Sequence, residues 1–539
     1  MTTPAASTEP SEMRQPENRQ TDAPVARMSR RQVLEALSGL MVGMFVSVLA
    51  ATIVGNALPR IIADLNGRQT VYTWIVTAEL LAMTATVPLW GKMADLYSKK
   101  ALTQLSLALF GVGSLLAGLT PNVELLVASR VVQGVGAGGM IALSTIVLAA
   151  MIPPRELGRY AGVFGAIFGL GTIAGPLIGG VLVDTDWLGW RWCFLIGVPF
   201  TLLSIVLLQR TLNLPVVRRE VRIDWLGAVL ITAGVSVLLI WSSLAGNTFA
   251  WASGWSATMV IAGVVLLALA IRVEARAAEP IIPLRIFRNR TVALATLASA
   301  LVGVAMFGST VFLSQYFQLS LGKSPTVAGW MSLPMVFGTL VSSTVAGQLI
   351  TKYGRWKAYL VAGGAMLLAG MLLLGTIDAE TSVPLLSLHM AVLGVGVGLL
   401  IQNLVLAAQN DVPAQDLGVA TSVVTFFRSM GGAVGVSALG ALLANRVTAQ
   451  LTERLGPVAG GGGGTAKVPN LAELPAPVRQ IVQEVYAVAT AELFLVGAPI
   501  ALLALIAVSF IREKPLHTLS GVERLTQEQD AAAAPTARG

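Results

Sequence analysis

The sequence predicts an all-α polytopic membrane protein, and three observations lead to that fold class. Hydrophobic residues make up 55% of the 539-residue chain and charged residues only 12%, about half the charged share that is usual in soluble proteins. The apolar residues form blocks of about 18 to 28 residues, long enough to cross a hydrocarbon core of about 30 Å as helices. These blocks lack the alternation of a β-barrel strand, so the backbone must satisfy its hydrogen bonds within helices.

We predict fourteen transmembrane helices from these blocks. They lie near residues 34–57, 74–95, 101–119, 124–150, 158–183, 190–209, 224–244, 256–273, 291–318, 325–350, 358–377, 384–408, 417–443 and 486–511. The loops after even-numbered blocks hold seventeen Lys and Arg residues, whereas the short loops after odd-numbered blocks hold four. Because basic loops stay on the cytoplasmic side, we expect a multi-pass protein of the cytoplasmic (inner or plasma) membrane with both termini in the cytoplasm.

Several functional classes are excluded by what the sequence lacks. The single cysteine, Cys193, permits no intramolecular disulfide, and with only two histidines we expect no metal site. No G-x-x-x-x-G-K-[ST] phosphate loop is present, which argues against an ATP-driven pump, and no catalytic constellation points to an enzyme. The net charge of +8 fits basic cytoplasmic loops better than nucleic-acid binding.

Two similar stretches occupy equivalent loops and predict a cytoplasmic latch. One joins the second and third blocks and the other joins the tenth and eleventh, and such repeated halves are typical of secondary transporters. The Asp95 carboxylate can bind the N-terminus of a neighbouring helix or a cytoplasmic arginine. The alternative is a basic turn that only anchors the chain at the membrane. The candidate latch residues are Gly91, Asp95, Lys99, Lys100, Gly347, Gly354 and Arg355.

The fifth block contains small residues at a spacing that predicts close helix packing. Gly171, Gly175 and Gly179 recur every four residues and form a smooth groove for another helix. Pro176, which Gly180 follows four residues later, removes one backbone hydrogen bond and allows a bend. In the fourth block, Gly134, Gly136 and Gly139 match G-x-G-x-x-G, but no strand precedes them, so we reject dinucleotide binding.

These motifs resemble the major facilitator superfamily, and the glycine–proline stretch resembles its antiporter-specific motif. A count of fourteen spans rather than twelve is similar to the count in its drug:proton antiporter branch. The resemblance covers about residues 34–512 and extends to Leu49–Pro59, Trp190–Pro199, Tyr316–Gln318, Ser324–Pro325, Ala328–Gly329, Gln409–Asn410 and Thr425–Arg428.

The resemblance implies two six-helix bundles with two additional central helices. We therefore expect a disordered cytoplasmic tail at 1–30, an N-terminal bundle at 31–212, two inserted helices at 213–280, a C-terminal bundle at 281–514 and a cytoplasmic tail at 515–539. The C-terminal bundle would contain an outer loop at 445–485. Within that loop, apolar residues from Val478 to Val485 predict a short helix that lies on the outer surface or caps the outer mouth, unless the segment is only a spacer.

The function implied by the resemblance is proton-coupled export of drug-like or amphipathic small molecules, antibiotics included. A dedicated exporter of an endogenous metabolite, lipid or amino acid is the alternative, and a non-transporting sensor or scaffold is a third. We expect no cofactor, because the proton gradient would supply the energy. The expected partners are the small-molecule substrate, protons and membrane lipid, with no nucleic acid; a monomer is compatible with the sequence.

The sequence departs from the family where a proton would bind. The family's first-span signature usually carries an aspartate at the position of Ala50, whereas Glu79 in the second block replaces a tyrosine or neutral residue. Arg130 lies at similar depth, so we predict that Glu79 is a protonation site tuned by Arg130. A cationic substrate could compete for the same carboxylate. Arg428 is a cavity candidate, and Glu492 is a second protonation candidate unless it only reaches the interface.

Overall fold

The structure is a computed structural model, and it confirms the all-α class. It describes residues 30–65, 69–157, 188–212, 224–245, 249–277, 280–455 and 475–533, together with positions 160, 167, 170–171, 174–175, 178–179, 181–182, 185 and 214. Within that part of the chain the regular elements are helices, and no β-strand occurs.

The first half of the described chain forms one group of helices around a buried centre. Helix α4 is mostly buried and packs against α2 and α3, while α1 packs against α7. Polar side chains mark where helices begin: Ser98 caps α3 and Asn122 caps α4, each accepting a hydrogen bond from a first-turn amide. The helices are α1 (Arg30–Asp64), α2 (Gln69–Leu96), α3 (Lys99–Gly118), α4 (Val123–Met151), α6 (Trp192–Leu195) and α7 (Gly197–Thr211).

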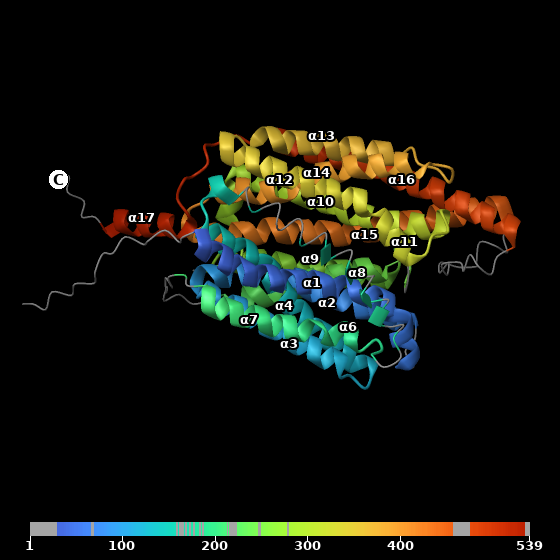
Figure 1. The fold of residues 1–539 in the computed structure, drawn as a ribbon, viewed down its shortest axis with the longest axis horizontal. Coiled ribbons are helices and arrows are strands. Elements are labelled where there is room, and N and C mark those ends of the chain that lie inside the picture. The colour runs from blue at the N-terminus through green and yellow to red at the C-terminus, as the bar shows by residue number, and fades with distance from the viewer. Residues whose placement is uncertain are drawn as a thin grey trace, which may run out of the picture.

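The second half forms another group, in which α10 packs against α15 and α14 packs against α12 and α13. A C-terminal helix, α17 (Gly521–Ala533), lies beyond one end of the bundle (Figure 1). The remaining elements are α8 (Trp225–Leu244), α9 (Gly254–Glu274), η1 (Leu284–Arg288), α10 (Arg290–Gln315), η2 (Tyr316–Ser320), α11 (Pro325–Met331), α12 (Leu333–Tyr353), α13 (Lys357–Leu374), α14 (Val383–Asn410), η3 (Ala414–Asp416), α15 (Leu417–Leu455) and α16 (Ala476–Ser509).

Twelve of the predicted membrane spans correspond to candidate spans in the structure. Twelve helical segments of the described residues are long and apolar enough to cross a membrane, and each matches one of the predicted blocks. The second block is the 28-residue helix α2, which is not among those twelve. The fifth block, near 158–183, falls largely outside the described residues, so the total of fourteen spans stays a prediction.

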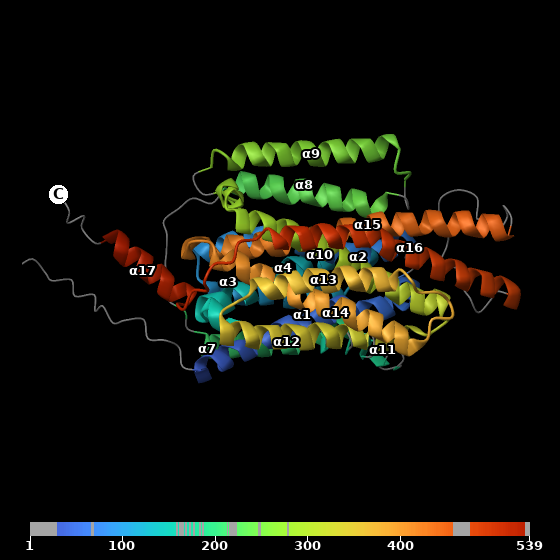
Figure 2. The same cartoon turned by 90° about the horizontal axis from the view of Figure 1, so that it is seen from above.

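The two groups meet where α2 packs against α15, and α8 packs on both of these helices. Helices α8 and α9 lie together at one side of the molecule, with α9 outermost (Figure 2). Apolar side chains such as Val229, Ile261 and Val265 are exposed on this pair, as expected for surfaces that face lipid. We call the end of the bundle that carries Tyr97, Ser98 and α17 the latch end.

The segment predicted as an outer loop at 445–485 is helical at both of its ends. Helix α15 continues to Leu455 and α16 already begins at Ala476, so only residues 456–474 between them lie outside the described part. The expected surface helix at 478–485 is instead the first part of α16, where Val482 and Val485 are buried against α15. These apolar residues pack against another helix, and a local sequence pattern does not reveal such a contact.

Candidate functional site

A buried ion pair joins α2 to α4. The Glu79 carboxylate contacts the Arg130 guanidinium, and the two residues are 5% and 1% exposed. Arg130 also donates hydrogen bonds to the carbonyl of Ile75 at 3.0 Å and to Oε1 of Gln133 at 2.7 Å. The Gln133 amide in turn donates to Ser114 of α3 at 2.8 Å. The structure therefore brings together Glu79 and Arg130, which the sequence predicts at similar depth in the membrane.

The Glu79 carboxylate is enclosed by protein on all sides. Gly134 of α4 lies against the α2 backbone, since a Cβ at that position would be 2.9 Å from Cα of Glu79. Oxygen Oε1 of Glu79 is buried and accepts no hydrogen bond from the described residues. Ala50 is buried as well, among Val46, Phe110 and Ala137. In this conformation the buried Glu79 carboxylate leaves no room for a substrate. The structure therefore does not show how a cationic substrate would reach Glu79 and compete with the proton.

The Asp95 carboxylate binds the beginning of α15, which belongs to the other group of helices. Its two oxygens accept hydrogen bonds from the amides of Gly418 at 2.9 Å and Val419 at 3.0 Å. These amides belong to the first turn of α15, where no helical carbonyl is available to them. The negative carboxylate also lies at the positive end of the helix dipole. The first of the two expected partners, a helix N-terminus, is therefore the one used.

Glycines make this contact between α2 and α15 possible. A Cβ at Gly91 would overlap Ser422 and lie 2.8 Å from the carbonyl oxygen of Gly418. A Cβ at Gly418 would lie 2.5 Å from both the carbonyl oxygen of Gly91 and the Asp95 carboxylate. The two backbones approach closely because neither residue has a side chain.

The second repeat is built differently and does not reach across the molecule. Gly354 ends α12 in a left-handed conformation with φ of 71°, which glycine adopts without strain. The amides of Trp356 and Lys357 donate to Oε1 of Glu513 at 2.8 and 3.1 Å, so a distant glutamate caps α13. Arg355 is exposed, and Gly347 is buried in α12.

Two basic residues of the first repeat, Lys99 and Lys100, lie at the start of α3. Lys99 is the first residue of α3, and the Lys100 ammonium donates to the carbonyl of Gln209 in α7 at 2.7 Å. These contacts tie α3 to α7. Gly91 and Asp95 of the first repeat therefore make the contacts between the two helix groups.

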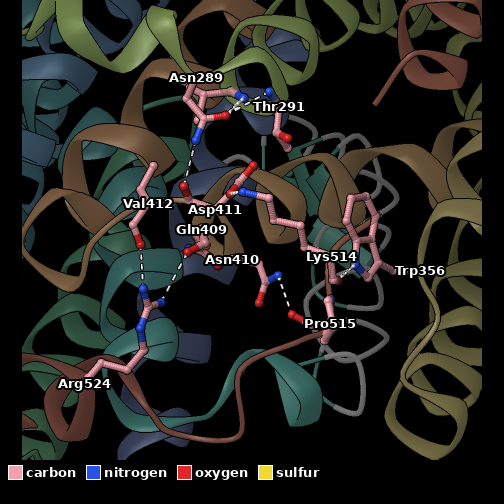
Figure 3. A network of polar contacts seen from close by, with 11 residues as sticks. Asn289, Thr291, Trp356, Gln409, Asn410, Asp411, Val412, Lys514, Pro515 and Arg524 are labelled. Carbon is pink, nitrogen blue, oxygen red and sulfur yellow. Dashed lines mark hydrogen bonds and ion pairs between the residues drawn. The ribbon is translucent and has the colours of Figure 1, made fainter. Parts of the chain in front are cut away.

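A C-terminal strap, residues 511–533, crosses the latch end (Figure 3). The indole of Trp356 donates to the carbonyl of Lys514 at 2.9 Å, and the Lys514 ammonium contacts the Asp411 carboxylate. The Asn410 side chain donates to the carbonyl of Pro515 at 3.0 Å and accepts from the amide of His517 at 3.0 Å. These four backbone and side-chain contacts fix the strap before α17 begins.

Helix α17 then reaches both helix groups. Arg524 is 7% exposed and donates to the carbonyls of Gln409 at 3.4 Å and Val412 at 2.5 Å. Burial lowers the pKa of the Arg524 guanidinium, and Glu528 partly restores it. Gly521 lies against Ala149 and Ala150 of α4 and against Leu417 of α15. The strap therefore adds a second bridge between the groups beside Asp95.

The glycine groove of the fifth block receives α1. A Cβ at Gly171 would lie 2.8 Å from Val48, one at Gly175 would overlap Thr52, and one at Gly179 would lie 2.7 Å from the carbonyl oxygen of Ile53. The Thr52 hydroxyl donates to the carbonyl of Gly171 at 3.1 Å. Pro176 and Gly180 lie outside the described residues.

The remaining two candidates lie in different surroundings. Glu492 pairs with Arg446 at 3.2 Å, and both side chains are over one-third exposed, near the end of the bundle opposite the latch end. Arg428 of α15 is half-buried and donates one long hydrogen bond, 3.5 Å, to the carbonyl of Ile401 in α14. Glu492 thus fits the interfacial interpretation, while Arg428 faces the interior of the second group.

Sequence reasoning missed the residues of the strap. Glu513, Lys514 and Arg524 come after the last apolar block, in a polar segment that reads as a tail. Their partners on α13 and α14 lie more than a hundred residues away in the sequence. The one local signal was the pairing of Ser520 with Glu523, a capping pattern in which each side chain binds the other's backbone amide.

Comparison with known proteins gives one consistent result. The family model described as Major Facilitator Superfamily matches residues 40–436. An uncharacterised MFS-type transporter of Mycobacterium tuberculosis is 37% identical, over 92% of this chain and 71% of its own. The multidrug transporter protein MdtP of Bacillus subtilis is 36% identical, over 80% of this chain and 79% of its own. The efflux pump dotC of Dothistroma septosporum is 31% identical, over 92% and 86%.

Solved structures share the fold at low sequence identity. The proton:xylose symporter XylE, bound to 6-bromo-6-deoxy-D-glucose, superposes with a TM-score of 0.59 at 14% identity, covering 92% of this chain and 99% of its own. The human organic anion transporter MFSD10 superposes with a TM-score of 0.57 at 15% identity, covering 87% and 99%. At this level of identity the likeness concerns the fold alone.

Proposed function

The chain belongs to the major facilitator superfamily, a family of membrane transporters rather than enzymes, and we propose that it is a proton-coupled antiporter that exports amphipathic small molecules. The observation that carries this proposal is the buried ion pair of Glu79 and Arg130. The names of the relatives MdtP and dotC support efflux as the direction of transport.

Proton binding at Glu79 would break this ion pair. A neutral Glu79 no longer attracts Arg130, which keeps its hydrogen bonds to Ile75 and Gln133. Oxygen Oε1 of Glu79, which has no hydrogen-bond partner among the described residues, is the atom where the proton would bind. Buried intramembrane carboxylates of this kind are typical of proton relays.

Helix α2 provides the mechanical link between proton binding and the latch. It carries Glu79 in its first half and Asp95 near its end, about 24 Å away at 1.5 Å per residue. Pro88 lies between them and removes one helical hydrogen bond, which creates a place to bend. A shift of α2 after protonation would pull Asp95 from the first turn of α15 and open the latch end.

We also propose the division of the chain and its orientation. Residues 31–212 and 281–514 are the two moving bundles, and α8 and α9 within 213–280 are an inserted pair that packs on α2 and α15 from the side. The latch end faces the cytoplasm of a cell whose plasma or inner membrane holds the protein, because the basic loops gather there. This structure then represents the conformation closed to the cytoplasm.

The proposal is tested with purified protein in sealed vesicles. An imposed pH gradient should drive accumulation of a fluorescent amphipathic substrate, and collapse of the gradient with a protonophore should stop it. Substrate movement that ignores the pH gradient would contradict proton coupling. A panel of chemically unrelated compounds then separates a multidrug exporter from a dedicated one, which would move a single compound class.

A further inference from the structure

Arg428 is a positive charge near the centre of the membrane. It is the twelfth residue of α15, so it lies about 16 Å from the start of that helix at the latch end. The hydrocarbon core is about 30 Å thick, which places Arg428 close to its middle. Arginines at such depth face protein or water and mark functional sites.

No carboxylate neutralises Arg428. Among the described residues it forms no ion pair, and its single hydrogen bond to Ile401 is at the long limit of 3.5 Å. The sequence offers no other partner at this depth, since every acidic residue except Glu79 and Glu492 lies at or beside a span end or outside the spans. Glu79 is bound by Arg130 and Glu492 by Arg446.

The helix around Arg428 is more exposed than the part before it. Residues 417–426 of α15 are buried, whereas the five consecutive residues 427–431 are all half-buried. Five consecutive helical positions point in all directions around the axis, so lipid contact on one side does not explain their exposure. This change from buried to half-buried residues occurs further along α15 than the contact with Asp95. A transporter that is closed at the latch end would be open in that direction.

The backbone at this point is held firmly against α10. A Cβ at Gly303 would overlap the carbonyl of Arg428, and a Cβ at Gly431 would overlap that of Ala300. The ring of Phe427 stacks edge-on against Phe426 and Phe287, with centroids 5.3 and 6.3 Å apart. The backbone of Arg428 is therefore fixed, while the N–H donors of its guanidinium are only weakly used.

We propose that Arg428 binds the anionic group of the exported substrate, so that the protein selects small aromatic organic anions, such as carboxylates or sulfonates. This inference rests on the proposed function and adds its substrate class. A carboxylate fits the planar guanidinium with two parallel hydrogen bonds and restores charge neutrality in the membrane interior. The apolar part of the anion would pack near Phe427.

A matched pair of fluorescent probes tests this proposal by binding to the purified full-length protein. Dansylglycine carries a carboxylate, and mono-dansylated ethylenediamine carries an ammonium group on the same aromatic body. We expect the wild-type protein to bind the carboxylate at least tenfold more tightly, the factor typical of one charge-assisted hydrogen bond. Arg428→Gln should abolish this preference, whereas Arg428→Lys should keep part of it.

The control is Arg446→Gln, which removes an arginine from the same helix outside the proposed site and should leave the preference unchanged. Equal binding of both probes by wild type, or an undiminished preference in Arg428→Gln, would overturn the proposal. If Arg428→Gln does not fold, a reduced preference in Arg428→Lys supports the proposal and an undiminished preference contradicts it. Binding needs no pH gradient, so a protein that prefers the anion but ignores the gradient would refute proton coupling alone.

Discussion

The carboxylate of Asp95 at the end of α2 accepts a hydrogen bond from the amide of Gly418 in the first turn of α15, at 2.9 Å. This contact joins the two helix groups at the latch end, and the amide of Val419 strengthens it at 3.0 Å. A charged acceptor for such amides is worth about 1.5–3 kcal/mol. In the proposed mechanism the two helix groups separate when that end opens, so the strength of this contact would set the balance between the closed and open conformations.

Asp95→Asn should impair transport about tenfold at matched expression. The neutral amide retains shape but loses the charge that favours the N-terminus of α15, so the closed conformation is less populated. Initial transport rates in vesicles measure the effect. The matched control is Asp416→Asn, two residues before Gly418, whose carboxylate pairs with the exposed Arg285 at 3.1 Å. Such exposed pairs contribute at most about 1 kcal/mol, so the control should transport normally.

Gly91→Ala should open the same end by a steric route. The new methyl group would overlap Ser422 and lie 2.8 Å from the carbonyl oxygen of Gly418, which forces α2 away from α15. We expect an increase in labelling of a cysteine introduced at Ser422, measured on a background with Cys193 replaced. Gly329→Ala is the control, because a Cβ there meets nothing within 4 Å. Unchanged labelling in Gly91→Ala would show that the helices tolerate the methyl group.

The sequence predicted the elements of this site better than their partners. Glu79 and Arg130 were found because a charge within an apolar block is costly and its depth can be counted along the helix. Asp95 was found because similar stretches occupy two equivalent loops. Glu513 and Arg524 were missed because polar residues after the last span have no such constraint. The contact between Arg446 and Glu492 was also missed, since a local pattern does not reveal how far α15 and α16 extend side by side.

Arg524→Ala should destabilise the latch end. The substitution removes two hydrogen-bond donors and leaves the buried carbonyls of Gln409 and Val412 without these hydrogen bonds. The free energy of unfolding should fall by about 1–3 kcal/mol. We expect a lower unfolding temperature in detergent and faster proteolysis after residue 510. Arg512→Ala, at an exposed position of the same strap, should behave as wild type. If both variants have equal unfolding temperatures and proteolysis rates, the contacts of α17 do not stabilise the latch end.

Glu79→Gln tests whether the buried pair serves coupling or only structure. Removing one partner of a buried ion pair leaves the other charge uncompensated, which costs about 3–5 kcal/mol, so this variant should both unfold at a lower temperature and lose export driven by the pH gradient.

The double variant Glu79→Gln/Arg130→Met separates the two effects. It removes the stranded charge as well, and buried pairs replaced in this way often regain their stability. If the pair only holds α2 against α4, the double variant should recover export together with its unfolding temperature. If Glu79 carries the proton, the double variant should be stable and still fail to respond to the pH gradient, while exchange of substrate down its own gradient continues. Unfolding temperature and vesicle transport, measured on the same preparations, distinguish these outcomes.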